Sequence, residues 1–362
     1  MSALFDAVAD LPLAVESSER TRRERDTSSG FVRTTTTFHL SGPASPDAEA
    51  SGSAHTGRGE DVSYDTEDHD ALAEAPAFDF AGEYTFAEFS AHLDDVDLFP
   101  TRDPERETAR HYRRWAVESA ALDLALRQND LSLSTAVGRD PDPVRFVASM
   151  RLGDPPTTDR LDAVLDAYPD TEFKLDPTPE WDDEVVDAAA ATDAVRILDL
   201  KGLYEGTEVD ADPDPDLYER ILAAFPDAVI EDPGLTPETR PLFDGEEGRI
   251  SWDYPITGVE SVENLPFEPE WLNIKPSRFG TVESLFETIE WAEKRDVALY
   301  GGGQFELGVG RDHIQLLASL FYPDGPNDVA PGGYNDPEVA PGLPTSPLDA
   351  PSNTVGLSYD GD

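Results

Sequence analysis

The stretch AVRILDLKGLY at residues 194–204 contains the unit on which the fold class depends. This unit is a short strand-like run that ends in an acidic residue and a lysine. Similar runs recur around it: EFKL at 172–175, VIEDP at 229–233, ISWD at 250–253 and WLNIK at 271–275. Stretches with helical or turn character separate these runs. Seven or eight such strand–helix units in about 190 residues predict a parallel sheet.

The predicted elements can be placed along the chain. We expect strands at 144–152, 172–175, 194–200, 228–230, 249–252, 271–274 and 297–300, with a weak eighth strand near 328–330. Helices are expected at 159–167, 182–191, 216–225, 237–243, 282–294 and 312–320. An open doubly wound sheet would need a glycine-rich phosphate turn after its first strand, whereas MRLGDPP stands there. The pattern therefore favours a closed barrel.

The first 106 residues have a different organisation, predicted to be α+β. Phe31–Leu40 (FVRTTTTFHL) is rich in β-branched residues and predicts a strand, with Gly57–Tyr64 as its partner. Between them, the Gly-, Ser- and Pro-rich segment Ser41–Thr56 predicts a loop.

Apolar residues at three- and four-residue intervals predict a helix over Glu107–Gln128. We divide the chain at 1–106, 107–330 and 331–362, and expect the last segment to pack back on the first.

Composition excludes several classes of function. The 362 residues include 76 acidic and 27 basic side chains, which give a formal net charge of −49. This balance is typical of proteins from extreme halophiles, and it argues against nucleic acid and anionic membranes as partners. Cysteine is absent, which excludes disulfides and thiolate nucleophiles. No apolar run approaches the ~18–20 residues of a membrane span, so we expect a cytoplasmic protein.

Lysine and acidic residues gather at the predicted strand ends. The chain has four lysines, and three of them stand there, in contrast to Lys294. In a barrel the carboxyl ends of the strands form the active-site mouth. Oxygen ligands suit Mg²⁺ or Mn²⁺, and lysine, unlike arginine, can lose its proton near neutral pH. We therefore predict a divalent-cation site facing proton-transfer residues; the competing interpretation is a set of strand-end caps and salt bridges. The residues concerned are Lys174, Asp176, Asp199, Lys201, Glu231, Asp232, Asp253 and Lys275.

These segments resemble the enolase superfamily, in its muconate-lactonising and o-succinylbenzoate-synthase-like branch. The matching segments, in family order, are RWAVESAALDLAL (114–126), RILDLKGLY (196–204), VIEDP (229–233), ISWDYPI (250–256), NIKPSRFG (273–280) and GGGQFELGVGRDHIQLLASL (301–320). The resemblance implies an α/β fold: a modified TIM (β/α)7β barrel with an N-terminal α+β capping domain. It also implies Asp199, Glu231 and Asp253 as metal ligands and Lys275 as an acid/base. Around the substrate it places Gly302, Gly303 and Glu306. Independently of the resemblance, Arg278 stands near the predicted mouth, where it could bind a second carboxylate or cap a helix.

The chain departs from the family pattern at the second strand. The family has Lys-x-Lys there, with the second lysine as base, whereas this chain has Lys174-Leu175-Asp176. Lys201 stands where asparagine is common. Three interpretations follow: Lys201 has become the base, with Asp176 orienting it or binding metal; Lys275 alone transfers protons; or catalysis is lost.

The resemblance implies a Mg²⁺-dependent (or Mn²⁺-dependent) lyase or isomerase that removes the α-proton of a small carboxylate. Lys275, together with Lys201 or Lys174, would transfer the protons. The alternative is a non-enzymatic member that binds a metal or ligand. Members of the superfamily are often homo-oligomers, and the resemblance leaves a homo-oligomer open here.

Overall fold

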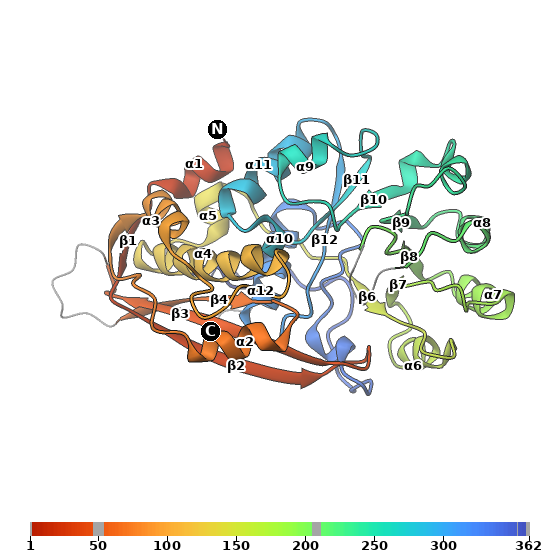
Figure 1. Cartoon of the computed structure of the whole chain (residues 1–362), viewed down its shortest axis with the longest axis horizontal. Coiled ribbons are helices and arrows are strands. Elements are labelled where there is room, and N and C mark those ends of the chain that lie inside the picture. Colours follow the sequence, from red (N-terminus) through yellow and green to blue (C-terminus); the bar gives the residue numbers. More distant parts are fainter. Residues whose placement is uncertain (1, 46–53, 205–210, 353, 360–362) are drawn as a thin grey trace.

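The computed structural model describes residues 2–45, 54–204, 211–352 and 354–359. Figure 1 shows a strand-rich N-terminal part at one end of the molecule and a curved sheet flanked by helices at the other. The predicted α/β fold with an N-terminal capping part is confirmed. The predicted loop Ser41–Thr56 falls partly on residues 46–53, which lie outside the described residues.

A three-stranded antiparallel sheet, in the order β2-β3-β4, forms the centre of the N-terminal part. It consists of β2 (Ser17–Asp26), β3 (Val32–Gly42) and β4 (His55–Asp61). The long helix α4 (Thr108–Gln128) packs against it. A Cβ atom on Gly59 would lie 2.0 Å from the carbonyl oxygen of Ala116, so glycine lets the strand approach the helix closely.

The remaining N-terminal elements are short. The strands β1 (Pro12–Val15) and β5 (Gly82–Thr85) pair with each other. The helical elements are α1 (Ala3–Ala9), α2 (Thr66–Glu74), α3 (Phe86–His92), η1 (Leu93–Asp95) and α5 (Leu133–Val137).

Seven parallel strands form the barrel sheet, in the order β12-β11-β10-β9-β8-β7-β6. They are β6 (Val147–Met150), β7 (Glu172–Leu175), β8 (Val195–Asp199), β9 (Val229–Glu231), β10 (Ile250–Trp252), β11 (Trp271–Ile274) and β12 (Ala298–Gly301). Each predicted strand is found within three residues of its expected bounds. The weak eighth strand is reduced to single bridges, in which Asn327 pairs with Phe146 and Asp328 with Gly302. These bridges join the first and last strands.

Five of the seven barrel helices in the described residues lie at predicted positions, and two short ones, at 259–263 and 276–279, were not predicted. The seven are α6 (Asp159–Ala167), α7 (Asp183–Ala191), α8 (Pro215–Ala224), α9 (Val259–Glu263), α10 (Pro276–Phe279), α11 (Val282–Glu293) and α12 (Val309–Phe321). The helix predicted at 237–243 is a short 3-10 turn, η2 (Arg240–Phe243), which contains a second proline, Pro241. Two more 3-10 turns are η3 (Glu247–Arg249) and η4 (Gly332–Asn335).

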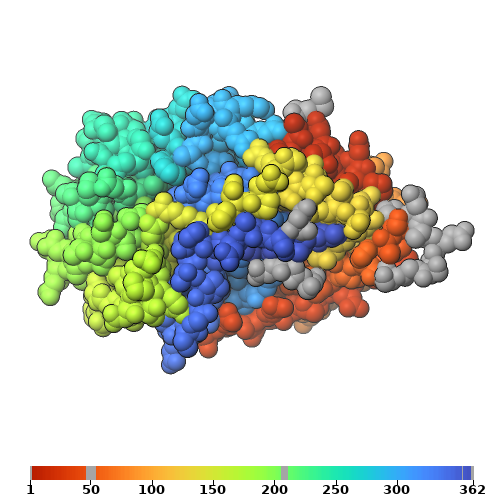
Figure 2. All heavy atoms as spheres, turned by 180° about the vertical axis from the view of Figure 1, so that it is seen from behind, coloured from red at the N-terminus to blue at the C-terminus, as the bar shows by residue number. Residues whose placement is uncertain are grey.

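The C-terminal segment crosses the back of the molecule, where Figure 2 shows it in dark blue beside the yellow region that precedes β6. Leu348 pairs with Val144 in a β-bridge, and the amide of Leu357 donates to Asp123 Oδ1 on α4 at 2.8 Å. The division of the chain at 106/107 stays a prediction. Among the described residues, no helix combines the length and the apolar character that a membrane crossing requires.

Candidate functional site

A cavity of about 480 Å³ opens at the carboxyl ends of the barrel strands, under the N-terminal part. A cavity of this size suits a small organic ligand. Its barrel wall includes Lys174, Asp176, Asp199, Lys201, Lys275, Arg278, Gly303 and Asp328. Its other wall includes Phe31, Tyr64 and Tyr112 from the N-terminal part and α4. Five of the eight strand-end residues that the sequence singled out thus line this cavity, whereas Glu231, Asp232 and Asp253 are not part of its lining.

Lys174 ends up between two carboxylates. Its Nζ lies 3.1 Å from Asp199 Oδ2 and donates a short hydrogen bond to Glu231 Oε1. All three side chains are buried. Burial alone would lower the pKa of Lys174, but the charges of Asp199 and Glu231 outweigh it and raise the pKa well above its usual value.

Lys201 binds the other side of Asp199. Its Nζ donates to Asp199 Oδ2 at 2.7 Å and lies 3.3 Å from Asp176 Oδ2. The backbone of Lys201 has a φ of 51°, a strained conformation of the kind that clusters at functional sites. Burial disfavours its charge, yet Asp176 and Asp199 raise the pKa of Lys201 above its usual value. Lys201 and Asp176, the two residues that depart from the enolase-superfamily pattern, thus form an ion pair with each other.

Asp253 anchors a second group of cations. Its Oδ2 accepts a hydrogen bond from the Tyr204 hydroxyl at 2.8 Å, and Lys275 Nζ lies 2.8 Å from the same atom. Arg278 Nη2 is 3.4 Å away. Burial would raise the pKa of Asp253, but Arg278 and Lys275 hold it well below its usual range. Burial would lower the pKa of Lys275, and Asp253 raises it instead.

Glu231 and Asp232 are also fully buried, and each has a different set of partners. Glu231 Oε2 accepts hydrogen bonds from the Tyr300 hydroxyl and from Asn273 Nδ2, the latter at 3.1 Å. Asp232 accepts the backbone amides of Asp253 at 2.9 Å and Tyr254 at 2.8 Å. Burial is the main cause that raises the pKa of Glu231 to about 8 and that of Asp232 to about 7.

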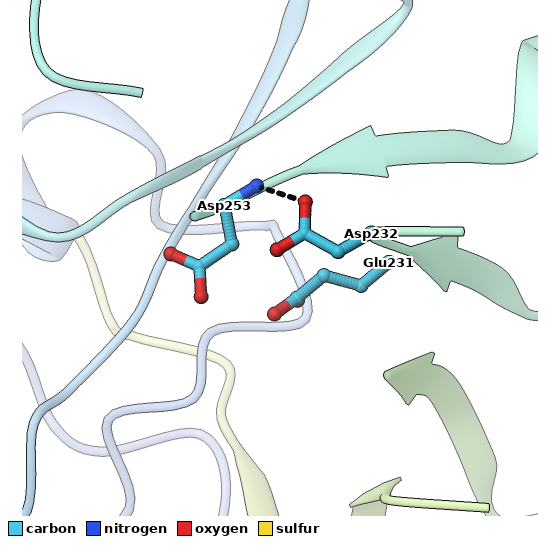
Figure 3. Close-up of side chains that lie close together, drawn as sticks. All are labelled: Glu231, Asp232 and Asp253. Carbon is cyan, nitrogen blue, oxygen red and sulfur yellow. Dashed lines mark hydrogen bonds between the residues drawn. The ribbon is translucent and has the colours of Figure 1, made fainter. Parts of the chain in front are cut away.

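Glu231, Asp232 and Asp253 form a group that fits a cation, because one oxygen from each lies within 4.8 Å of the others (Figure 3). Opposite ligands of Mg²⁺ lie about 4.2 Å apart, so small shifts would suffice. Among the residues that the structure describes, Asp253 Oδ1 is buried without a hydrogen-bond partner. Asp199, the third predicted ligand, has its Oδ2 shared between two lysines and lies outside this group.

The predicted substrate-binding residues divide between the cavity wall and its support. Gly303 and Arg278 line the cavity. A Cβ atom on Gly302 would lie 2.6 Å from Lys275 Cε, so this glycine makes room for the lysine. Glu306 is buried; its Oε1 accepts the amide of Gln304 at 2.6 Å, and its Oε2 lies 3.1 Å from Arg311 Nη2. It therefore shapes the loop that carries Gln304.

Several cavity residues escaped sequence reasoning. The rings of Tyr204 and Tyr254 lie 4.3 Å apart between centroids, and the guanidinium of Arg278 lies over Tyr254. Asp328 lines the cavity beside the bridge that replaces the eighth strand, and burial raises its pKa to about 6. Tyr204 stands three residues after Lys201 and Tyr254 directly follows Asp253, so nearness to a strand end was the available signal.

Known structures share this architecture. An enolase superfamily member from Listeria innocua Clip11262 is similar with a TM-score of 0.65 and 19% identity, covering 96% of this chain and 95% of that one. Muconate lactonizing enzyme from Pseudomonas putida is similar with a TM-score of 0.65 and 18% identity, covering 95% of this chain and 96% of that one. Dipeptide epimerase from Enterococcus faecalis V583 is similar with a TM-score of 0.66 and 12% identity, covering 96% of this chain and 99% of that one. At these identities the likeness establishes the fold, and the predicted resemblance to the enolase superfamily is confirmed at that level.

No curated protein sequence matches the chain. Two sequence-family models do match it. The N-terminal domain of the family described as "Domain of unknown function (DUF8230)" covers residues 6–136, and the C-terminal domain of the same family covers residues 140–336. The chain therefore belongs to the DUF8230 family, whose two domains here adopt the fold of enolase-superfamily proteins.

Proposed function

We propose that the cavity is an active site that removes the α-proton of a small carboxylate with the help of a divalent cation, leading to elimination or isomerisation. The observation that carries the proposal is the meeting of two buried lysines, Lys174 and Lys275, and the half-buried Lys201 with carboxylates at one strand-end cavity. The names of the structural neighbours, which include a lactonizing enzyme and an epimerase, support catalysis of this kind.

Asp199, Glu231 and Asp253 would hold the cation, with Asp232 beside them. A divalent cation there supplies a Lewis acid that binds the substrate carboxylate and stabilises the enediolate. Arg278 and Tyr204 fix Asp253 in place. The aromatic wall formed by Tyr112, Tyr204 and Tyr254 limits water around the substrate.

Lys275 is the residue we assign to proton transfer. Its Nζ pairs with Asp253, whose charge raises the pKa of Lys275 and favours the protonated form, so it can deliver a proton or stabilise a developing oxyanion. Lys275 would act as a base once a cation was bound to Asp253. The cation would weaken the attraction between Asp253 and Lys275, which is what raises the pKa of Lys275. Lys201, oriented by Asp176, is the candidate second proton carrier.

Ligand binding without catalysis is the alternative function. It is favoured by the pairing of Lys174, Lys201 and Lys275 with carboxylates that raise the pKa of each of them. A permanently protonated lysine cannot abstract a proton from carbon. The two functions differ in whether a bound carboxylate exchanges its α-hydrogen.

The test is deuterium incorporation. The protein would be incubated with Mg²⁺ and molar KCl in D₂O with a panel of mono- and dicarboxylates, N-acylamino acids and sugar acids, and mass spectrometry would follow the exchange. We expect exchange with one substrate class and a loss of about 100-fold or more in Lys275→Met. Lys294→Met is the matched control, because the side chain of Lys294, at the end of α11, is 67% exposed and its ammonium pairs with Glu290, away from the cavity lining.

Exchange that persists unchanged in Lys275→Met would contradict the assigned role. If folded, cation-loaded protein exchanged no member of the panel, ligand binding would replace catalysis as the better account.

A further inference from the structure

The ammonium of Lys174 lies where a bridging cation would have to lie. It contacts Asp199 Oδ2 at 3.1 Å and one oxygen of Glu231, and the lysine is 2% exposed. Asp199 and Glu231 stand at the ends of the neighbouring strands β8 and β9, where residues 199 and 231 pair directly in the sheet. Their side chains therefore meet at one point, which Lys174 reaches from β7.

We infer that Lys174 is a built-in counter-cation that competes with a divalent cation for the position between Asp199 and Glu231. A divalent cation held by both Asp199 and Glu231 would need the carboxylate oxygens that the ammonium of Lys174 contacts. Two positive charges cannot share that buried position. Binding of the divalent cation must therefore displace the ammonium.

The cavity offers the displaced ammonium another carboxylate. Asp328 lines the same cavity as Lys174, and after Asp199 and Glu231 its charge is a further cause that raises the pKa of Lys174. A rotation of the lysine towards Asp328 would keep its charge partnered. It would also move the ammonium from the floor of the site into the space open to a ligand, so cation binding would prepare the cavity for an anionic substrate.

The inference rests on one part of the proposed function, the binding of a divalent cation by these carboxylates. It does not depend on catalysis. Cation binding and lysine displacement can both be measured without a substrate, whereas proton exchange tests the proposed function separately.

The chain suits a direct experiment because it has four lysines. Protein labelled with ¹³C at lysine Cε would give four NMR signals, each assigned by a single Lys→Met variant. On titration with MgCl₂ we expect the Lys174 signal to shift most and the Lys294 signal to stay in place. Magnesium binding, followed by calorimetry on the same sample, that left the Lys174 signal unmoved would overturn the inference. The variants serve only to assign the signals, and the titration that decides the question is made on the wild-type protein.

A second measurement uses affinity. Lys174→Met removes the competitor, so Mn²⁺ binding followed by electron paramagnetic resonance should tighten by about tenfold or more, while Lys294→Met should bind as the wild type does. Equal or weaker binding in folded Lys174→Met would overturn the competition. If neither protein bound Mn²⁺ or Mg²⁺, the inference and the cation part of the proposed function would both fail, while proton exchange in the presence of EDTA would still show an enolising site.

Discussion

At the scale of single residues, a buried carboxylate joins the long helix α4 to the barrel. Glu118 Oε1 accepts the amide of Val282, the first residue of α11, at 2.8 Å, and Arg114 Nε lies 3.4 Å from its Oε2. Burial is the main cause that raises the pKa of Glu118 to about 7, and Arg114 opposes it only in part. The folded protein therefore holds a proton that the unfolded chain releases at lower pH.

The consequence can be measured with Glu118→Gln, which keeps a carbonyl acceptor and removes the charge. A folded pKa of about 7 against 4.5 unfolded means that the wild type loses stability as pH rises between these values. Relative to the variant, we expect a loss of up to about 3 kcal/mol between pH 4.5 and pH 8. Urea unfolding of both proteins at four pH values would show it. A stability difference that did not vary with pH would contradict the raised pKa.

At the scale of elements, a carboxylate from one part of the molecule caps a helix of the other. The barrel helix α12 begins after Gly308 without a side-chain cap of its own. Glu60 on β4 accepts the amides of Leu307 at 2.8 Å, of Gly308 at 3.0 Å and of Gly310 at 2.8 Å. These amides would otherwise be unsatisfied at a helix start, where negative charge is also favourable.

Glu60→Ala should therefore destabilise the protein by about 2–4 kcal/mol, because buried amides lose their acceptor. It should also loosen the loop that presents Gln304 to Tyr64, whose hydroxyl donates to Gln304 Oε1 at 2.8 Å. Glu67→Ala, in the exposed first turn of α2, is the control and should change stability by less than about 1 kcal/mol. Equal unfolding midpoints for the two variants in urea would refute the capping role.

At the scale of the whole molecule, the net charge of −49 dominates the response to salt. The Debye length falls from about 10 Å at 0.1 M salt to about 3 Å at 1 M, which screens repulsion between surface carboxylates. Buried pairs such as Arg113–Asp61, whose atoms lie 2.8 Å apart, are screened much less. We therefore expect added salt to stabilise the folded protein, because it screens surface repulsion while the buried ion pairs persist.

Thermal unfolding in KCl checks this expectation. Between 0.1 M and 1 M KCl we expect Tm to rise by roughly 5 °C or more, equivalent to a gain of about 4 kcal/mol for a chain of this length. NaCl at matched ionic strength should act similarly, since screening depends on ionic strength. A Tm that fell with added salt would show that attractive surface pairs outweigh the repulsion.

Much of the barrel could be predicted because its signals are local. Glu172–Leu175 and Trp271–Ile274 have the predicted bounds, since apolar runs between turn residues define buried parallel strands. The long strand β2 was missed because SSERTRRERD has no apolar alternation. It lies at the edge of its sheet, where charged side chains are common. Pairing with β3, which lies in the middle of the sheet, makes this segment a strand.

The sequence by itself determined the fold class, the order of the strands and the presence of lysines and carboxylates at their carboxyl ends. It did so because strand periodicity is local and parallel strands end at a common edge. Only the tertiary structure decided that Lys174 pairs with Asp199 and Glu231, that Asp176 meets Lys201, and that Asp328 and Tyr204 join the cavity. These contacts depend on distances of a few ångströms between residues far apart in the chain, which are set by the packing of the curved parallel sheet and not by any pattern within one segment.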